Sequence, residues 1–220
     1  MLEEKYSIIS AKMSGQKQIQ SIDSSILRRI RAHGRGWIFT PDSFLDIGSR
    51  IAIDHALSRH TRKGAIRRLT RGLYDYPRLH AELGELAPPV DDVAKALAGR
   101  DAIRLQPSGA YAANLLGLST QVPVRTVFLT DGSSRTVHLG KRQIILKRTT
   151  PRQMATAGRS SGTVIQALRW IGARHVNDQT IAILRQRLSA SDKQQLLKDI
   201  RYAPAWIAKI IRQCARSEEA

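Results

Sequence analysis

Cysteine is almost absent from this sequence, since Cys214 is the single one among 220 residues. The chain can therefore form no internal disulfide and no zinc site built from several cysteines, which favours a reduced, cytoplasmic setting. Cys214 itself is expected as a small core residue of the last helix. No run of about 18 apolar residues occurs, as a membrane-spanning helix would need, and the N-terminal stretch has no apolar segment typical of a signal peptide. We expect a cytoplasmic protein without membrane association.

The chain also has few of the features that mark catalytic sites. It contains no P-loop and no Gly-x-Gly-x-x-Gly after a strand. His55 and His60 are five positions apart, a spacing that does not place two metal ligands on one helical face. The segment 131–134 (Asp-Gly-Ser-Ser) is similar to the Gly-Ser turn of nucleotidyltransferases, but no carboxylate pair follows it on a strand, so a hairpin turn is expected. We predict a protein that is not an enzyme and uses no cofactor or metal ion.

Acidic residues are half as frequent as basic ones. There are 36 Lys and Arg against 18 Asp and Glu, which gives a formal net charge of +18. The excess lies in two regions, because residues 1–79 carry 15 basic and 7 acidic residues and residues 141–187 carry 10 and 1. The segment between them is close to neutral. Such a surface attracts polyanions, since each phosphate that is neutralised releases condensed counterions.

The first basic region has the pattern of a DNA-reading module. Capping residues, apolar periodicity and Gly stops predict a helix over 23–33, a short helix over 41–46 and a third helix over 49–63. Two strands follow, at 65–69 and 73–76, joined by a tight Thr-Arg-Gly turn. This order predicts a winged helix-turn-helix domain over residues 22–80, after an N-terminal extension over 1–21.

Composition changes from Ala81, and Ala87-Pro88-Pro89 marks a linker or the opening loop of a second domain over 81–220. Strand-like runs at 124–130, 136–139 and 143–147 predict a small antiparallel meander. Downstream of Gly162 the apolar period becomes helical. The expected fold class is α+β, with a winged helix-turn-helix domain followed by a C-terminal domain of a small antiparallel sheet plus helices.

The third helix of the first domain is the expected reader of DNA. Its apolar side, Ile53, Ala56, Leu57 and His60, should face the core. The other side and the helix start hold the expected major-groove residues, which are Ser49, Arg50, His55, Ser58, Arg59 and Arg62. Arg68, Thr70 and Arg71 on the hairpin should contact the DNA backbone or the minor groove.

The second basic region is expected to face phosphate as well. It contains ten basic residues and one acidic residue, so mutual salt bridges cannot account for its charge. The residues proposed for this second surface are Lys141, Arg142, Lys147, Arg148, Arg152, Arg159 and Arg174, with Arg169, Arg185 and Arg187 nearby in sequence. The alternative is an ordinary solvated face without a ligand.

A family resemblance runs through most of the chain after Asp23. The segments are Gly36-Trp-Ile-Phe-Thr-Pro-Asp-Ser-Phe44, Asp46-Ile-Gly-Ser49, Ala56-Leu-Ser-Arg59, Lys63-Gly-Ala-Ile-Arg-Arg-Leu69 and Arg71-Gly-Leu-Tyr-Asp-Tyr-Pro77. In this order they resemble the N-terminal domain of AbiEi-type antitoxins. Pro107-Ser-Gly-Ala-Tyr111, Leu116-Gly-Leu118 and Ala203-Pro-Ala-Trp206 are similar to the C-terminal domain of that family.

The resemblance implies a bacterial transcriptional autorepressor that binds double-stranded DNA at inverted repeats in its own promoter. It also implies an antitoxin of the type IV kind, which antagonises a nucleotidyltransferase toxin without needing to contact it. Such a protein would be a monomer in solution or a dimer on DNA. Three alternatives stay open: a module that sequesters a toxin directly, a stand-alone DNA-binding regulator, and a nucleic-acid enzyme, for which the sequence offers no good catalytic carboxylate.

Overall fold

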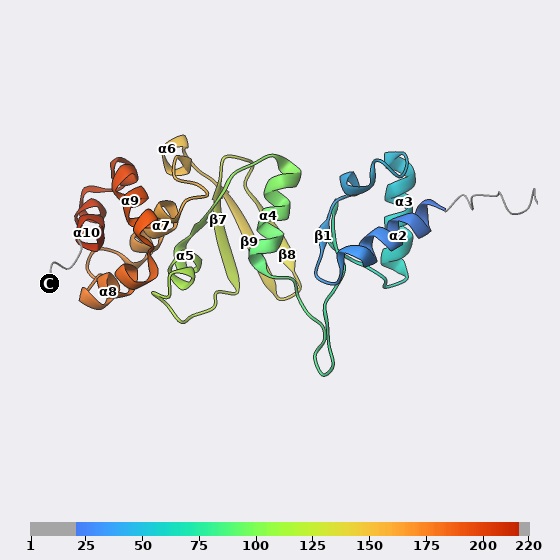
Figure 1. Cartoon of the computed structure of the whole chain (residues 1–220), viewed down its shortest axis with the longest axis horizontal. Coiled ribbons are helices and arrows are strands. Elements are labelled where there is room, and N and C mark those ends of the chain that lie inside the picture. The colour runs from blue at the N-terminus through green and yellow to red at the C-terminus, as the bar shows by residue number, and fades with distance from the viewer. Residues whose placement is uncertain (1–20, 216–220) are drawn as a thin grey trace, which may run out of the picture. The chain divides into compact units, whose positions relative to one another are not determined.

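Residues 21–215 are described by the computed structural model, and they form two units of mixed α+β structure (Figure 1). Within this range the first unit contains residues 21–68 and 74–85, and the second contains 69–73 and 86–215. The sequence places the domain boundary at residue 80, whereas the units divide after residue 85. Of the extension expected over 1–21, all but Ser21 lies outside the described residues. None of the described helices is long and apolar enough to cross a membrane.

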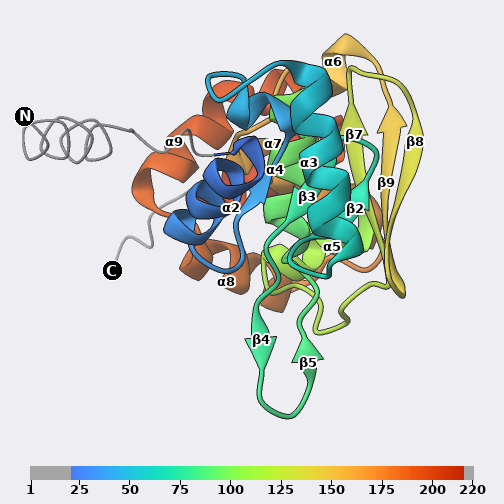
Figure 2. The same ribbon diagram turned by 90° about the vertical axis from the view of Figure 1, so that its right-hand side faces the viewer.

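The first unit has the helices that the sequence predicts, together with a hairpin whose tip, residues 69–73, is grouped with the second unit. Its elements are α2 (Ile22–His33), β1 (Ile38–Phe39), η1 (Pro41–Phe44), α3 (Arg50–Arg62), β2 (Arg67–Thr70) and β3 (Leu73–Asp75). The strands form one sheet in the order β1-β3-β2. Gly72, with φ of +69°, provides the left-handed backbone conformation that the tight β2–β3 turn needs. A second hairpin, β4 (Leu79–His80) with β5 (Gly84–Glu85), was not predicted; it is fully exposed and projects into solvent (Figure 2).

Helix α3 packs into the core of the first unit through the side that its apolar periodicity predicts to be buried. Ile53, Ala56 and Leu57 are completely buried, and they join the same cluster as Ile26, Ile30 and Phe44. Full burial of one such large side chain stabilises a fold by about 1.5–3 kcal/mol. The start of α3 is fixed by Ser49, whose hydroxyl accepts a hydrogen bond from the Ala52 amide at 3.4 Å. Core and cap together determine which side of α3 faces solvent.

The second unit combines a four-stranded sheet with helices. In chain order it contains α4 (Val90–Asp101), β6 (Leu105–Ser108), α5 (Gly109–Leu115), β7 (Arg125–Thr130), β8 (Arg135–Leu139), β9 (Arg142–Arg148), α6 (Pro151–Met154), α7 (Ser160–Ile171), α8 (Asp178–Arg187), α9 (Ala190–Asp199), η2 (Ile200–Tyr202) and α10 (Ala205–Ala215). Helices α7 to α10 gather beside the sheet (Figure 1) and share one apolar cluster. Cys214 lies in this cluster, as predicted, and burial raises the pKa of its thiol.

The antiparallel meander expected over 124–147 is wrong. The sheet order is β6-β7-β9-β8, and β9 runs parallel to β7 while pairing antiparallel with β8. The apolar content of the strands explains this order, because β9 buries Ile144 and Leu146 and takes a central place, whereas β8 exposes alternate polar residues and lies at the edge.

The segment 131–134 is therefore not a hairpin turn. It connects β7 to β8, which are not neighbours in the sheet, and so crosses the end of β9, which lies between them. Asp131 accepts hydrogen bonds from the amide and the guanidinium Nε of Arg104, both at 2.8 Å. The Ser134 hydroxyl accepts one from the Arg148 amide at 2.9 Å, at the end of β9. These contacts fix the crossover at both of its ends.

Candidate nucleic-acid interface

The solvent-facing side of α3 is the candidate interface. Five of the six residues that the sequence places in the major groove lie on this helix and are exposed, namely Arg50, His55, Ser58, Arg59 and Arg62. The predicted inward residue His60 is 6% exposed, and its Nε2 lies 3.1 Å from the backbone oxygen of Asp23. Ser49 is also exposed, although its hydroxyl serves as the helix cap.

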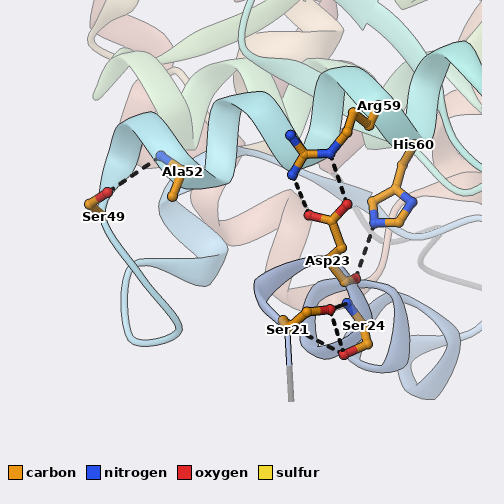
Figure 3. Close-up of polar contacts among 7 residues, drawn as sticks. All are labelled: Ser21, Asp23, Ser24, Ser49, Ala52, Arg59 and His60. Carbon is orange, nitrogen blue, oxygen red and sulfur yellow. Dashed lines mark hydrogen bonds and ion pairs between the residues drawn. The ribbon is translucent and has the colours of Figure 1, made fainter. Parts of the chain in front are cut away.

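Two of the three arginines on α3 are held by carboxylates of the same unit. Arg59 makes a bidentate contact with Asp23, with Nε to Oδ2 at 2.9 Å and Nη2 to Oδ1 at 2.5 Å (Figure 3). Arg50 contacts Asp42 at 2.7 Å and Asp54 at 3.2 Å. The hydrogen bond from Arg59 lowers the pKa of the Asp23 carboxyl, so this group is ionised at neutral pH.

His55, Ser58 and Arg62 differ from these arginines, because none has a hydrogen-bond or ion-pair partner for its side chain among residues 21–215. Their spacing of three and four residues places them on one stripe of the helix. Ile51 continues this stripe by one turn and is 72% exposed, which is unusual for a large apolar side chain. From Ile51 to Arg62 the stripe extends about 16 Å along the helix at ~1.5 Å per residue.

The tip of the β2–β3 hairpin is held through its backbone. The carbonyl oxygen of Arg71 accepts a hydrogen bond from Nη1 of Arg100 in α4 at 2.6 Å, and both residues belong to the second unit. The side chains of Arg68 and Arg71 are exposed, and Thr70 is half-buried. The predicted arginine-tipped hairpin therefore exists, with its turn anchored on α4.

The residues proposed for the second basic surface have different roles in the structure. Lys141, Arg142, Lys147, Arg148 and Arg174 are exposed, with four of them at the two ends of β9 and Arg174 in the loop between α7 and α8. Arg152 and Arg159, in contrast, make contacts that hold the fold. The guanidinium of Arg152 donates to the Arg201 carbonyl at 3.3 Å, and that of Arg159 donates to buried Asp199 at 2.7 Å.

Asp199, at the end of α9, is the buried acceptor in a cluster of polar side chains from the helical part of the second unit. Its carboxylate also accepts hydrogen bonds from the Ser161 hydroxyl at 2.6 Å and from Gln195 at 2.9 Å. Burial alone would raise the pKa of Asp199, but these hydrogen bonds and the one from Arg159 outweigh burial and lower it. Arg159 therefore has a structural role, and we regard it as the weakest candidate for phosphate contact in its set.

Residues 158–162 read Gly-Arg-Ser-Ser-Gly, which is the spacing of the nucleophile elbow of serine hydrolases. That motif requires a strand before the serine and a histidine beside it. Here Ser160 begins α7 after the short helix α6, and its hydroxyl bonds Asp192, whose pKa it lowers. No hydrogen bond joins Ser160 to a histidine in the described chain, nor do the described residues contain a group of three or more His, Cys, Asp or Glu that could hold a metal ion.

The carboxylates beside α3 are what sequence reasoning missed. Arg50 and Asp54 are an i, i+4 pair on one helix, so their spacing could have revealed the contact. Asp23 and Arg59 are 36 positions apart, and no local pattern predicts that they meet. Arg100, which anchors the hairpin from 29 positions away, is equally invisible in the sequence.

Fold and surface together define a two-unit α+β protein whose first unit presents a polar and cationic helix face to solvent. The chain matches the protein-family model DUF6088, described as a family of unknown function, over residues 25–196, and it belongs to that family. Among solved structures it is similar to the crystal structure of the RV2827C protein from Mycobacterium tuberculosis, with 14% identity and a TM-score of 0.46 over 92% of this chain and 84% of that one. No curated protein matches the chain.

Proposed function

We propose that this chain is a DNA-binding transcriptional regulator that reads duplex DNA through α3. The observation that carries the proposal is the stripe of His55, Ser58 and Arg62, which is solvent-facing, without side-chain partners among residues 21–215, and continued by exposed Ile51. Arginine and histidine donate hydrogen bonds to base edges and phosphates, and an apolar side chain can contact a thymine methyl group. An exposed stripe of this kind suits the major groove, which is wide enough for a helix.

The order of elements in the first unit supports a winged helix-turn-helix arrangement. Helix α2 and the short η1 precede α3, and the β2–β3 hairpin follows it, as expected when α3 is the recognition helix and the hairpin is the wing. In this arrangement Arg68 and Arg71 would contact the phosphate backbone or the minor groove beside the major-groove site. Anchoring of the turn by Arg100 would hold the wing in a fixed conformation before DNA binds.

Exposed cations of the second unit would contact further phosphates of the bound DNA. A substitution of Arg174 tests this expectation. Replacement of Arg174 by Ala should weaken binding to all duplexes alike and reduce the slope of log affinity against log salt by about 0.9, the value for one lost phosphate contact. Fluorescence-polarisation titrations at several salt concentrations measure both quantities. Arg174→Lys is the matched control and should retain most of the affinity, whereas a loss restricted to one DNA sequence would contradict a phosphate role.

The resemblance to AbiEi-type antitoxins supports a narrower proposal for the same protein. It would bind inverted repeats in its own promoter as a pair of chains and so repress a co-encoded nucleotidyltransferase toxin. Expression of the neighbouring gene with and without this chain tests the antitoxin part, since growth should stop only without it. If toxicity persists in its presence, the protein is a regulator without antitoxin activity; co-purification with the toxin in moderate salt would instead favour direct sequestration.

A further inference from the structure

We propose that Asp23 restrains Arg59 and thereby lowers the affinity of this protein for DNA of random sequence. The inference rests on the proposed DNA binding by α3 and concerns how that same surface is controlled. Arg59 lies on α3 directly after Ser58 of the exposed stripe, and its side chain is 44% exposed. A free guanidinium at this position would contact any phosphate that approached, regardless of sequence.

The geometry of the pair makes Asp23 a strong competitor for that guanidinium. Two nearly parallel hydrogen bonds, at 2.9 Å and 2.5 Å, occupy one edge of Arg59 (Figure 3). Bidentate contacts between arginine and carboxylate are among the stronger charged hydrogen bonds of proteins. A DNA phosphate can also accept two hydrogen bonds from a guanidinium, but it must first displace a carboxylate that is already bound at Nε and Nη2. This competition reduces what Arg59 contributes to a non-specific complex.

The backbone that carries the Asp23 side chain is held in place independently of Arg59. The backbone oxygen of Asp23 lies 3.1 Å from Nε2 of His60, which is buried and is the next residue along α3. On the other side, the Ser21 hydroxyl caps α2 by accepting the Ser24 amide at 3.2 Å, and this hydrogen bond fixes the turn that contains Asp23 (Figure 3). Helix α3 thus contacts Asp23 twice, so little conformational entropy is lost when the ion pair forms.

The negative charge of Asp23 acts in the same direction as the restraint. Its side chain is 30% exposed, and the hydrogen bond from Arg59 lowers its pKa, so the charge is present at neutral pH beside the stripe. The Asp23 carboxylate repels DNA phosphates, and this repulsion disfavours any duplex that makes no other favourable contact to offset it. Because a genome presents a large excess of random sites, weaker random binding leaves more of the protein free to occupy its own sites.

Replacement of Asp23 by Asn tests this proposal on a duplex of random sequence, without knowledge of the natural binding site. The released Arg59 should gain a phosphate contact, so affinity should rise about three- to tenfold at low salt and the salt slope should steepen by about 1. The matched control is the same change in an Arg59→Ala background, where the gain should be much smaller, because only the effect of the removed negative charge remains. Thermal unfolding of each variant checks that the fold is retained.

The outcomes separate this inference from the function on which it rests. An equal gain in the Arg59→Ala background would mean that Asp23 acts only through its charge, and the restraint would be refuted. No gain at all, with a wild-type protein that binds random duplex, would refute it as well. A wild-type protein that binds no duplex at low salt would overturn the proposed function itself.

Discussion

Simultaneous replacement of His55, Ser58 and Arg62 by Ala should reduce sequence-specific DNA binding at least about 100-fold, because three good base contacts at about 1 kcal/mol each, the low end of their usual range, already sum to about 3 kcal/mol. The three side chains are exposed and have no side-chain partners within the described chain, so their removal should leave the free energy of unfolding within about 1 kcal/mol of the wild-type value. Titration of DNA from upstream of the gene, beside random duplex, measures the effect. The loss should be several times larger on the upstream DNA.

A suitable control for the triple variant is Arg212→Ala, which removes an exposed arginine from α10 in the second unit. It should preserve the preference for the upstream DNA. If the triple variant loses affinity equally for both duplexes, the stripe contacts phosphates only and does not read sequence. If it keeps full affinity, α3 is not the interface.

Replacement of Gly162 by Ala should destabilise the second unit by about 3 kcal/mol or more, the range of severe overpacking in a core. Gly162 lies in the first turn of α7, and a Cβ added there would stand 2.1 Å from Oε1 of Gln106 and 2.5 Å from the backbone oxygen of Thr156. The amide of Gln106 can rotate, but the Thr156 carbonyl can move only with its backbone. Chemical denaturation followed by circular dichroism measures the loss.

Gly99→Ala provides the matched control for Gly162→Ala. Gly99 is also helical, in α4 of the same unit, but a Cβ there would meet no atom within 4 Å. Alanine should therefore stabilise the protein by up to about 1 kcal/mol through its higher helix propensity. If both substitutions had the same effect, close packing of α7 against β6 would not be the reason for glycine at position 162.

Much of the first unit could be predicted because its determinants are local. The spacing of Ile53, Ala56 and Leu57 identifies the buried side of α3, and Ser49 marks where the helix begins. Both signals depend on residues within a few positions of one another. The exposed side of α3 follows from them, which is why His55, Ser58 and Arg62 were predicted on the correct face.

The features that could not be predicted from the sequence are contacts between residues that are distant along the chain. The pairing of Arg59 with Asp23 needs α2 and α3 placed against each other, and this is determined by their shared core rather than by spacing. The strand order failed for a similar reason. A segment as short as 131–134 is compatible with a hairpin or with a crossover, and burial of Ile144 and Leu146 in β9 decides between them.

The most direct test of DNA reading by α3 uses the fact that Cys214, the only cysteine, is buried and therefore poorly accessible to labelling reagents. A Ser58→Cys variant can then be labelled at that position with a DNA-cleaving chelate and bound to the DNA upstream of its gene, with Ser191→Cys on α9 as the control. Our account predicts cuts clustered within the protected site from position 58 and none there from position 191. A protected site that position 58 leaves uncut would contradict it.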